Sequence, residues 1–287
     1  MYKFIPIVKK LVWGTEYWVV SGVPGNESVI SDGPCAGKNI TDIYPGQFPL
    51  LIKFIDAISE PSIQVHPNDE IAAKRHGCKG KTEMWYVTGA AKGATLLSGL
   101  KTEITPDDYV RLVEKDEIVS VLAEHEVSEG DVYFLPAGRI HAIGGGCSLA
   151  EIQQTSDITY RIYDYGRVGL DGKPRQLHTQ EAKDAIDYTV YPDYRTHYVP
   201  AKDKLVEVVN CPYFVTSVLD LSKAFELPLD NVGDFVIVIA LEGEAALKVG
   251  TGETCQIAAG EAVLVPVSDM SAAIVPQTTA KFLVTHV

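Results

Sequence analysis

A pattern of glycine, proline and histidine in the middle of the chain requires a sharp hairpin. Residues 130–141 read GDVYFLPAGRIH, and Asp131 to Leu135 have the composition of a strand. Pro136 presets one backbone angle and Gly138 is free to take a positive φ, so we expect the chain to turn there. His141 then begins the return strand. A single histidine on an apolar strand is usually a buried core residue, so its companions must decide its role.

The same pattern returns near the C-terminus without the histidine. The segment GEAVLVP at 260–266 repeats the GDVYFLP of the first copy at the same internal spacing. The repeat predicts two copies of one β-barrel unit. Ser271 stands in the second copy where His141 stands in the first, and Ile237 is aligned with Glu83. We therefore expect a polar site in the first copy alone.

The remaining sequence is predicted to be mainly β. From residue 205 onward, short β-rich runs alternate with turn signals, which is typical of a sandwich or barrel. Helices are predicted over three segments: 68–76, 103–127 and 179–186. The stretch 164–197, with a turn at Asp171-Gly172, is interpreted as a bridge. We thus expect two domains, 1–197 including the bridge and 198–287.

Charge and composition exclude several classes of function. The net charge of −13 opposes binding to nucleic acid and to anionic membranes. No export signal and no long apolar run is found, so no membrane partner is expected. The five cysteines are widely spaced and contain no CxxC pair, which favours a reducing cytoplasm.

Three further segments place polar side chains on shared strand faces. In SIQVHP (62–67), Gln64 and His66 lie two residues apart and so point to one face if the segment is a strand. In GKTEMW (80–85), the same period puts Lys81 and Glu83 on a common face. A third segment, AEIQQTSDITYR, follows at 150–161.

These segments together resemble the type I mannose-6-phosphate isomerases of the short bacterial kind, in the cupin superfamily. The likeness is dense from Trp13 to His178 and thin afterwards, and Gly145 replaces the asparagine that often ends the histidine motif. Cupins are small double-sheet jelly-roll barrels. The resemblance implies a mainly β protein with two such barrels, the second degenerate, and a few short helices.

The resemblance also implies one zinc ion per chain. Its ligands would be Gln64, His66, Glu83 and His141. Two imidazoles, one carboxylate and one amide oxygen form a mixed site that leaves room for water or substrate. Ligand type alone would equally admit Mn²⁺ or Fe²⁺.

The implied reaction interconverts mannose 6-phosphate and fructose 6-phosphate through an enediolate. Such chemistry needs a stabiliser for the oxyanion and a group that moves a proton. The resemblance points to Arg161, Lys81 and Glu151 as catalytic residues. Each has a plainer interpretation: Arg161 in a surface ion pair, Glu151 as a residue that orients a ligand, and Lys81 as a solvated strand-edge lysine.

The substrate phosphate needs cationic or polar donors. Arg167 and Arg175 belong to a basic cluster that suits phosphate, with Ser62 as a weaker candidate. A cluster on a turn is, however, often only solvated. We expect a phosphosugar partner and a monomer or homodimer. The alternative function is a cupin that binds a sugar or sugar phosphate without converting it; an oxygenase is disfavoured because Gln64 replaces the first histidine of the usual His-x-His pair.

Overall fold

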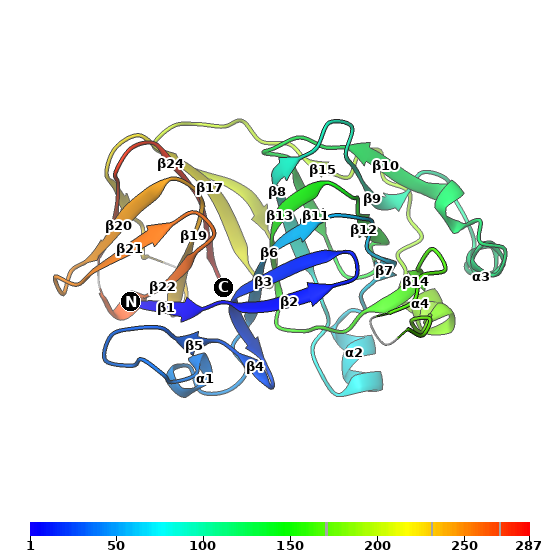
Figure 1. The fold of residues 1–287 in the computed structure, drawn as a ribbon, viewed down its shortest axis with the longest axis horizontal. Helices are drawn as coiled ribbons and strands as arrows, with labels where there is room; N and C mark the ends of the chain where they lie inside the picture. The colour runs from blue at the N-terminus through cyan, green and yellow to red at the C-terminus, as the bar shows by residue number, and fades with distance from the viewer. Residues whose placement is uncertain (170–171, 231, 270) are drawn as a thin grey trace. The chain divides into compact units, whose positions relative to one another are not determined.

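Antiparallel β-sheets form the framework of the chain, which divides into two units. The computed structural model describes residues 1–169, 172–230, 232–269 and 271–287 (Figure 1). Unit 1 comprises Met1–Ile7, Val19–Pro49 and Thr196–Val287, and unit 2 comprises Val8–Trp18 and Leu50–Arg195. The change of unit after Arg195 lies close to the expected boundary at residue 197, but Met1–Ile7 and Val19–Pro49, which were expected in the first domain, group with unit 1. The turn expected at Asp171-Gly172 falls partly outside the described residues.

Unit 2 is built from two antiparallel sheets. In order across the sheet, the first consists of β10 (Leu122–Glu126), β9 (Thr95–Leu100), β12 (His141–Ile143), β7 (Ile63–Val65) and β14 (Tyr160–Tyr163). The second consists of β15 (Arg195–Thr196), β11 (Val132–Leu135), β8 (Glu83–Ala90), β13 (Cys147–Gln154), β6 (Leu50–Ala57), β3 (Gly14–Val23) and β2 (Ile7–Leu11), with β4 (Asn26–Glu27) on β3. By residue range, β4, the part of β3 from Val19 onward and the end residues Ile7 and Thr196 are counted with unit 1.

The two sheets of unit 2 share an apolar core. Trp85 and Val87 of β8 belong to one buried cluster with Leu96 of β9 and Ile143 of β12. Because side chains alternate between the faces of a strand, these core residues fix which side chains of each strand point between the two sheets. The polar residues of the site lie on strands whose neighbours are locked into that core.

The helices of unit 2 begin at polar caps. Helix α2 (Asp69–His76) starts where Asn68 Oδ1 accepts a hydrogen bond from Ile71 N, at 2.9 Å. Helix α3 (Pro106–Glu114) starts at a capping box of Thr105 and Asp108, and α4 (Thr179–Ala185) lies beside β14 (Figure 1). None of the described helices has the length and apolar character needed to cross a membrane.

The helix predicted over 103–127 is wrong in its second half. After α3 the chain forms a short 3₁₀ turn, η1 (Ile118–Val121), and then strand β10. Pairing with β9 places His125 opposite Leu96, so tertiary strand pairing outweighs the polar, helix-compatible composition of this stretch.

Unit 1 contains the second copy of the repeat. Its larger sheet has the order β16 (Leu205–Asn210), β17 (Val215–Leu221), β24 (Ala280–His286), β19 (Phe235–Glu242), β22 (Ala262–Pro266), β1 (Tyr2–Ile5) and β5 (Val29–Ile30). Its smaller sheet has the order β18 (Phe225–Leu227), β23 (Ala272–Pro276), β20 (Glu244–Val249) and β21 (Thr254–Ala258), and the unit also holds α1 (Ile40–Ile43) and η2 (Val267–Asp269).

Strand register shows what the second copy lacks. Glu83 lies opposite Leu135 in unit 2, and Val236 lies opposite Val265 at the matching place in unit 1. The structural counterpart of Glu83 is therefore Val236, one residue before the Ile237 expected from the sequence. Both residues are apolar and buried, so the second copy offers no carboxylate at this position.

Candidate metal centre

Four of the predicted residues come from strands that the two sheets of unit 2 bring together. Gln64 lies on β7 opposite His141 of β12, and His66 follows directly after β7. Glu83 begins β8 in the other sheet. Residues opposite each other in an antiparallel pair project to the same face, so Gln64 and His141 face the same way and Glu83 approaches them from the facing sheet.

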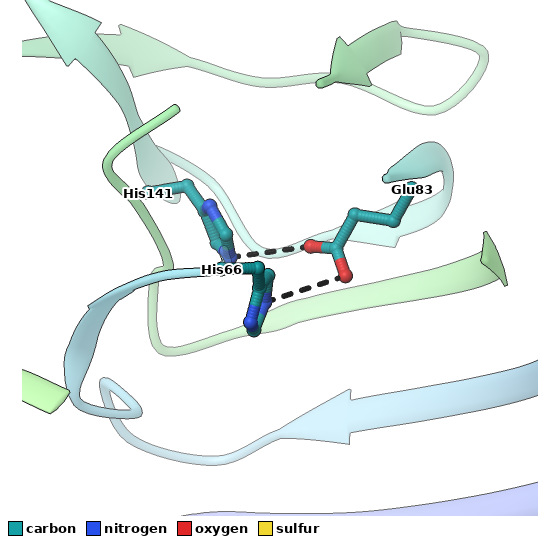
Figure 2. A group of neighbouring side chains, drawn as sticks. All are labelled: His66, Glu83 and His141. Atoms are coloured by element: carbon teal, nitrogen blue, oxygen red, sulfur yellow. Dashed lines mark ion pairs between the residues drawn. The ribbon is translucent and has the colours of Figure 1, made fainter. Parts of the chain in front are cut away.

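The imidazoles and the carboxylate converge within a small volume (Figure 2). His141 Nε2 lies 3.2 Å from Glu83 Oε1, and His66 Nε2 lies 3.5 Å from Glu83 Oε2. One ligand atom from each of the three residues lies within 4.8 Å of the others. Gln64 joins them, since its Nε2 is 3.3 Å from His141 Nε2.

Backbone carbonyls fix which nitrogen of each histidine faces the centre. His66 Nδ1 donates to the Ile158 carbonyl at 2.7 Å, and His141 Nδ1 donates to the Arg139 carbonyl at 2.8 Å. These bonds place the proton on Nδ1 and leave a lone pair on each Nε2. Both lone pairs point to the centre, as a metal ligand requires.

Burial keeps the histidines neutral. Burial, and then the charge of Lys81, hold the pKa of His66 well below its usual range and lower the pKa of His141 to about 3. Burial, and then the carboxylate of Glu151, raise the pKa of Glu83 to about 7. The site therefore disfavours the protonated form of both imidazoles and the ionised form of Glu83.

The donor set fits a divalent cation. Glu83 is fully buried, and among the described residues neither of its oxygens has a hydrogen bond of regular geometry, although Lys81 Nζ lies 2.7 Å from Oε2. Two imidazole lone pairs and a buried carboxylate are the ligands that zinc prefers in catalytic sites. A cation held there would bond to carboxylate oxygens whose hydrogen bonding is incomplete and would add to the positive charge of Lys81 beside Glu83.

Two lysines and a second carboxylate adjoin the centre. Lys81 Nζ lies 3.1 Å from His66 Nε2 and 3.9 Å from Glu151 Oε1. Glu151 Oε1 accepts from Lys53 at 2.9 Å, and its Oε2 accepts from the indole of Trp85 at 2.8 Å. Trp85 also packs edge-on against the His141 ring, so the network is tied directly to a candidate ligand.

Ion pairing keeps this network charged. Burial alone would raise the pKa of Glu151, but Lys53 and Lys81 lower it to about 2. Burial would likewise lower the pKa of Lys53, but Glu151 and Glu16 raise it instead. Glu151 is thus an ionised carboxylate with both oxygens occupied.

A cavity of about 230 Å³ opens beside the centre. Its lining includes residues of the candidate metal centre and charged neighbours: Gln64, Lys81, Glu151, Lys53 and Arg161. The wall also includes Trp13, Glu16 and Trp18. The volume suits a small polar ligand.

Of the three predicted arginines, Arg161 and Arg175 line this cavity and Arg167 does not. Arg161 lines it, and its Nε donates to Ser62 Oγ at 3.2 Å. Arg175 also lines it and donates from Nε to Asp164 at 2.7 Å. Arg167 does not contribute to the lining; it pairs with Asp164 at 2.9 Å and donates to the Glu60 carbonyl.

The ion pairing of Lys53 with Glu151 and Glu16 was not predicted from the sequence. Lys53 interrupts the apolar run of β6, which is a visible signal, but its partner is set by pairing with Glu151 across β6 and β13. Glu16 lies 3.8 Å from Lys53 and accepts from the Trp18 indole at 2.6 Å. Neither contact follows from local sequence.

Comparison with known proteins agrees with the fold and the site. No family model matches the chain. Mannose-6-phosphate isomerase ManA of Bacillus subtilis is 31% identical over 277 residues, which cover 86% of this chain and 87% of that protein. The crystal structure of the mannose 6-phosphate isomerase from Bacillus subtilis superposes with a TM-score of 0.91 at 28% identity, over 100% of this chain and 99% of that one.

A more distant structure shares the fold. It is a mannose 6-phosphate isomerase bound with zinc and yttrium, 16% identical, with a TM-score of 0.76 over 100% of this chain and 99% of that one. These likenesses and the antiparallel sheets of each unit confirm the mainly β cupin fold expected from the sequence. Since the relative that is 31% identical is matched over most of its length, the chain belongs to the mannose-6-phosphate isomerase family.

Proposed function

We propose that this chain is a zinc-dependent aldose–ketose isomerase that interconverts mannose 6-phosphate and fructose 6-phosphate through an enediolate. The observation that carries the proposal is the convergence of His66, Glu83 and His141 beside a cavity lined by Lys81 and Arg161. Membership of the family supports the choice of substrate.

We assign one zinc ion to Gln64, His66, Glu83 and His141. The Nδ1 bonds of both histidines support this assignment because they leave each Nε2 free to ligate. Turning the Gln64 amide over would present its oxygen in place of Nε2, 3.3 Å from His141 Nε2. When bound, the ion supplies positive charge that stabilises negative charge on substrate oxygens.

The reaction moves protons between two carbons and two oxygens. Starting from the aldose, a proton leaves C2 and O1 is protonated; a proton then leaves O2 and one returns to C1, which gives the ketose. Lys81 is our choice for the group that handles protons, because its ammonium lies next to His66 and Glu83. The ammonium would donate a proton to O1, and the neutral amine so formed would accept the proton that leaves C2; the reverse transfers at O2 and C1 restore the ammonium. Arg161 is placed to stabilise charge on the enediolate.

Glu151 takes part as a charged neighbour of both lysines. Its oxygens accept from Lys53 and Trp85, and its pKa is lowered to about 2 by those lysines despite burial. A carboxylate so stabilised is a weak base, which favours an orienting role for Glu151 over proton abstraction, the other role left open by the sequence.

The phosphate is assigned to the cationic end of the cavity. Arg175 and Ser62 line it beside Arg161, and Arg167 shares Asp164 with Arg175. Pairing with Asp164 holds the Arg175 guanidinium at the cavity wall, where its remaining N–H groups can donate to phosphate. Arg167, outside the lining, would act by holding Asp164 in place.

The remaining parts of the proposal concern the whole chain. We divide it functionally into residues 1–197, which carry catalysis and the bridge, and residues 198–287, a degenerate cupin domain. The partner is a small phosphosugar, with no nucleic acid or membrane, and the protein acts in the cytoplasm as a monomer or homodimer.

The decisive experiment is a coupled assay that follows fructose 6-phosphate formed from mannose 6-phosphate by zinc-loaded protein. Turnover that disappears on chelation and returns with zinc is expected. A zinc-loaded protein that binds the phosphosugar without converting it would instead favour the non-catalytic sugar-binding cupin. Trying several hexose and pentose phosphates in the same assay defines the range of sugars.

A further inference from the structure

The segment that joins the two parts of the chain packs on the turn that carries His141. This turn, Pro136–Ile140, has Gly138 at φ 92°. A Cβ at Gly138 would lie 2.9 Å from the Ala185 carbonyl oxygen, and Asp187 N donates to the Gly138 carbonyl at 2.8 Å. The end of α4 and the residues after it therefore touch the backbone of the turn itself.

Arg139 extends from this turn into an aromatic clamp. Its guanidinium carbon lies 4.6 Å from the ring centroid of Tyr191 and 4.6 Å from that of Tyr194. The arginine is only 8% exposed. Cation–π contacts strengthen when the cation is withdrawn from water. Two rings on one buried guanidinium therefore hold the Arg139 side chain in place.

The clamp is fastened to the neighbouring strand as well. Tyr194 OH donates to the Leu100 carbonyl at 2.7 Å and accepts from Leu100 N at 3.1 Å. A Cβ on Gly99 would lie 2.1 Å from the Tyr194 ring, so only glycine leaves room for it. Since β9 pairs with β12, and Gly99 N donates to the Ile140 carbonyl at 2.8 Å, Tyr194 holds both sides of the turn.

Arg139 is also the residue whose carbonyl orients His141. That carbonyl accepts from His141 Nδ1 at 2.8 Å, and this bond directs Nε2 toward Glu83. Partners that orient a histidine ligand typically change metal affinity by about 10–100-fold when they are altered. A shift of the Arg139 backbone would therefore rotate the His141 ring and change the direction of its Nε2 lone pair.

We propose that Tyr191 and Tyr194, by clamping Arg139, are positioning residues for the His141 metal ligand. The bridge, predicted from the sequence only as a connection, thereby supports the metal centre. This inference rests on the proposed function in that it takes His141 to be a metal ligand. It does not depend on which sugar is the substrate.

Four variants test the clamp. Arg139→Lys keeps the charge but loses the planar group that stacks between the rings, and Tyr191→Leu removes one ring at a residue that is 39% exposed and tolerant of change. Tyr191→Phe keeps the ring. Arg195→Lys is the matched control. Arg195 lies on the same bridge and its guanidinium carbon is 5.7 Å from the Tyr133 ring, but it donates to Tyr133 OH and to the Glu126 carbonyl and not to the Pro136–Ile140 turn.

The readouts are zinc affinity, from competition with a chromophoric chelator, and the visible absorption spectrum of the Co²⁺-loaded protein. We expect Arg139→Lys and Tyr191→Leu to weaken zinc binding about tenfold and to shift the Co²⁺ bands. Tyr191→Phe and Arg195→Lys should behave as wild type. Thermal unfolding of each metal-free variant identifies any that fail to fold. If Arg139→Lys does not fold, the comparison of Tyr191→Leu with Tyr191→Phe at this partly exposed residue decides whether the clamp affects zinc affinity.

Two results would overturn the inference: wild-type zinc affinity and spectrum in folded Arg139→Lys and Tyr191→Leu, or an equal loss of affinity in Arg195→Lys. Failure of the proposed function looks different. A wild-type protein that binds zinc but converts no mannose 6-phosphate would overturn that function, while the zinc affinities of the variants would still decide the role of the clamp.

Discussion

Replacing Lys53 by methionine tests how the buried charges beside the metal centre are balanced. Lys53 is 6% exposed and Glu151 is 3% exposed, so water cannot replace the lost partner. In Lys53→Met the Glu151 carboxylate keeps the Trp85 indole at 2.8 Å and Lys81 at 3.9 Å. It loses the ammonium at 2.9 Å, and an ionised group is left in a low-dielectric site.

The size of the effect follows from two independent estimates. Removing one partner of a buried ion pair costs about 3–5 kcal/mol. The pKa of Glu151 is lowered from 4.5 to about 2; a difference of about 2.5 pH units at about 1.4 kcal/mol per unit corresponds to about 3–4 kcal/mol. Lys53 is the largest favourable contribution to that lowering, so we expect a loss of about 3 kcal/mol at pH 7.

The assay is urea unfolding of the metal-free proteins. The lowered pKa of Glu151 stabilises the wild-type fold fully above pH 4.5, and this stabilisation is lost as the pH falls toward 2. The difference in unfolding free energy between wild type and Lys53→Met should therefore become smaller below pH 4.5. The double variant Lys53→Met with Glu151→Gln should recover most of the loss, since the amide oxygen still accepts from Trp85.

Lys9 offers a matched control, since its Nζ lies 4.9 Å from the Trp18 ring and that of Lys53 lies 5.3 Å from the same ring. Lys9 is only half-buried and Lys9→Met should cost less than about 1 kcal/mol. Equal stability of Lys53→Met and wild type at pH 7, or a double variant no more stable than the single one, would refute the reasoning.

Three other changes probe separate parts of the protein. His141→Ala should remove most of the zinc found by metal analysis, because it deletes a ligand; a variant that retains full zinc would rule out the ligand set. Arg161→Ala should lower kcat while zinc content stays at the wild-type level, and normal turnover would remove Arg161 from the reaction. Thr105→Ala deletes the cap of α3 and should cost about 1 kcal/mol in unfolding without altering turnover, whereas unchanged stability would show that the cap is not needed.

Local chemistry explains which elements were predictable. Pro136 and Gly138 restrict the backbone so strongly that the turn before His141 follows from the sequence, and Gly138 indeed has φ 92°. Thr105 and Asp108 identify the start of α3 in the same way. The strand at Leu122–Glu126 was not predictable, because its conformation depends on pairing with β9.

Distant pairings explain what was missed in the site. Lys53 reaches Glu151 only because β6 and β13 pair in one particular register, and a shift by one residue would turn Lys53 to the other face. Arg139 meets Tyr191 and Tyr194 through the fold of the bridge, where no periodic pattern marks the contact.

The most direct test of the account is anomalous diffraction at the zinc edge from crystals of the zinc-loaded protein. We expect one strong peak per chain, about 2.0–2.2 Å from the Nε2 atoms of His66 and His141 and from oxygen atoms of Glu83 and Gln64. A peak at any other place in the chain, or none at this centre in protein shown to contain zinc, would contradict it.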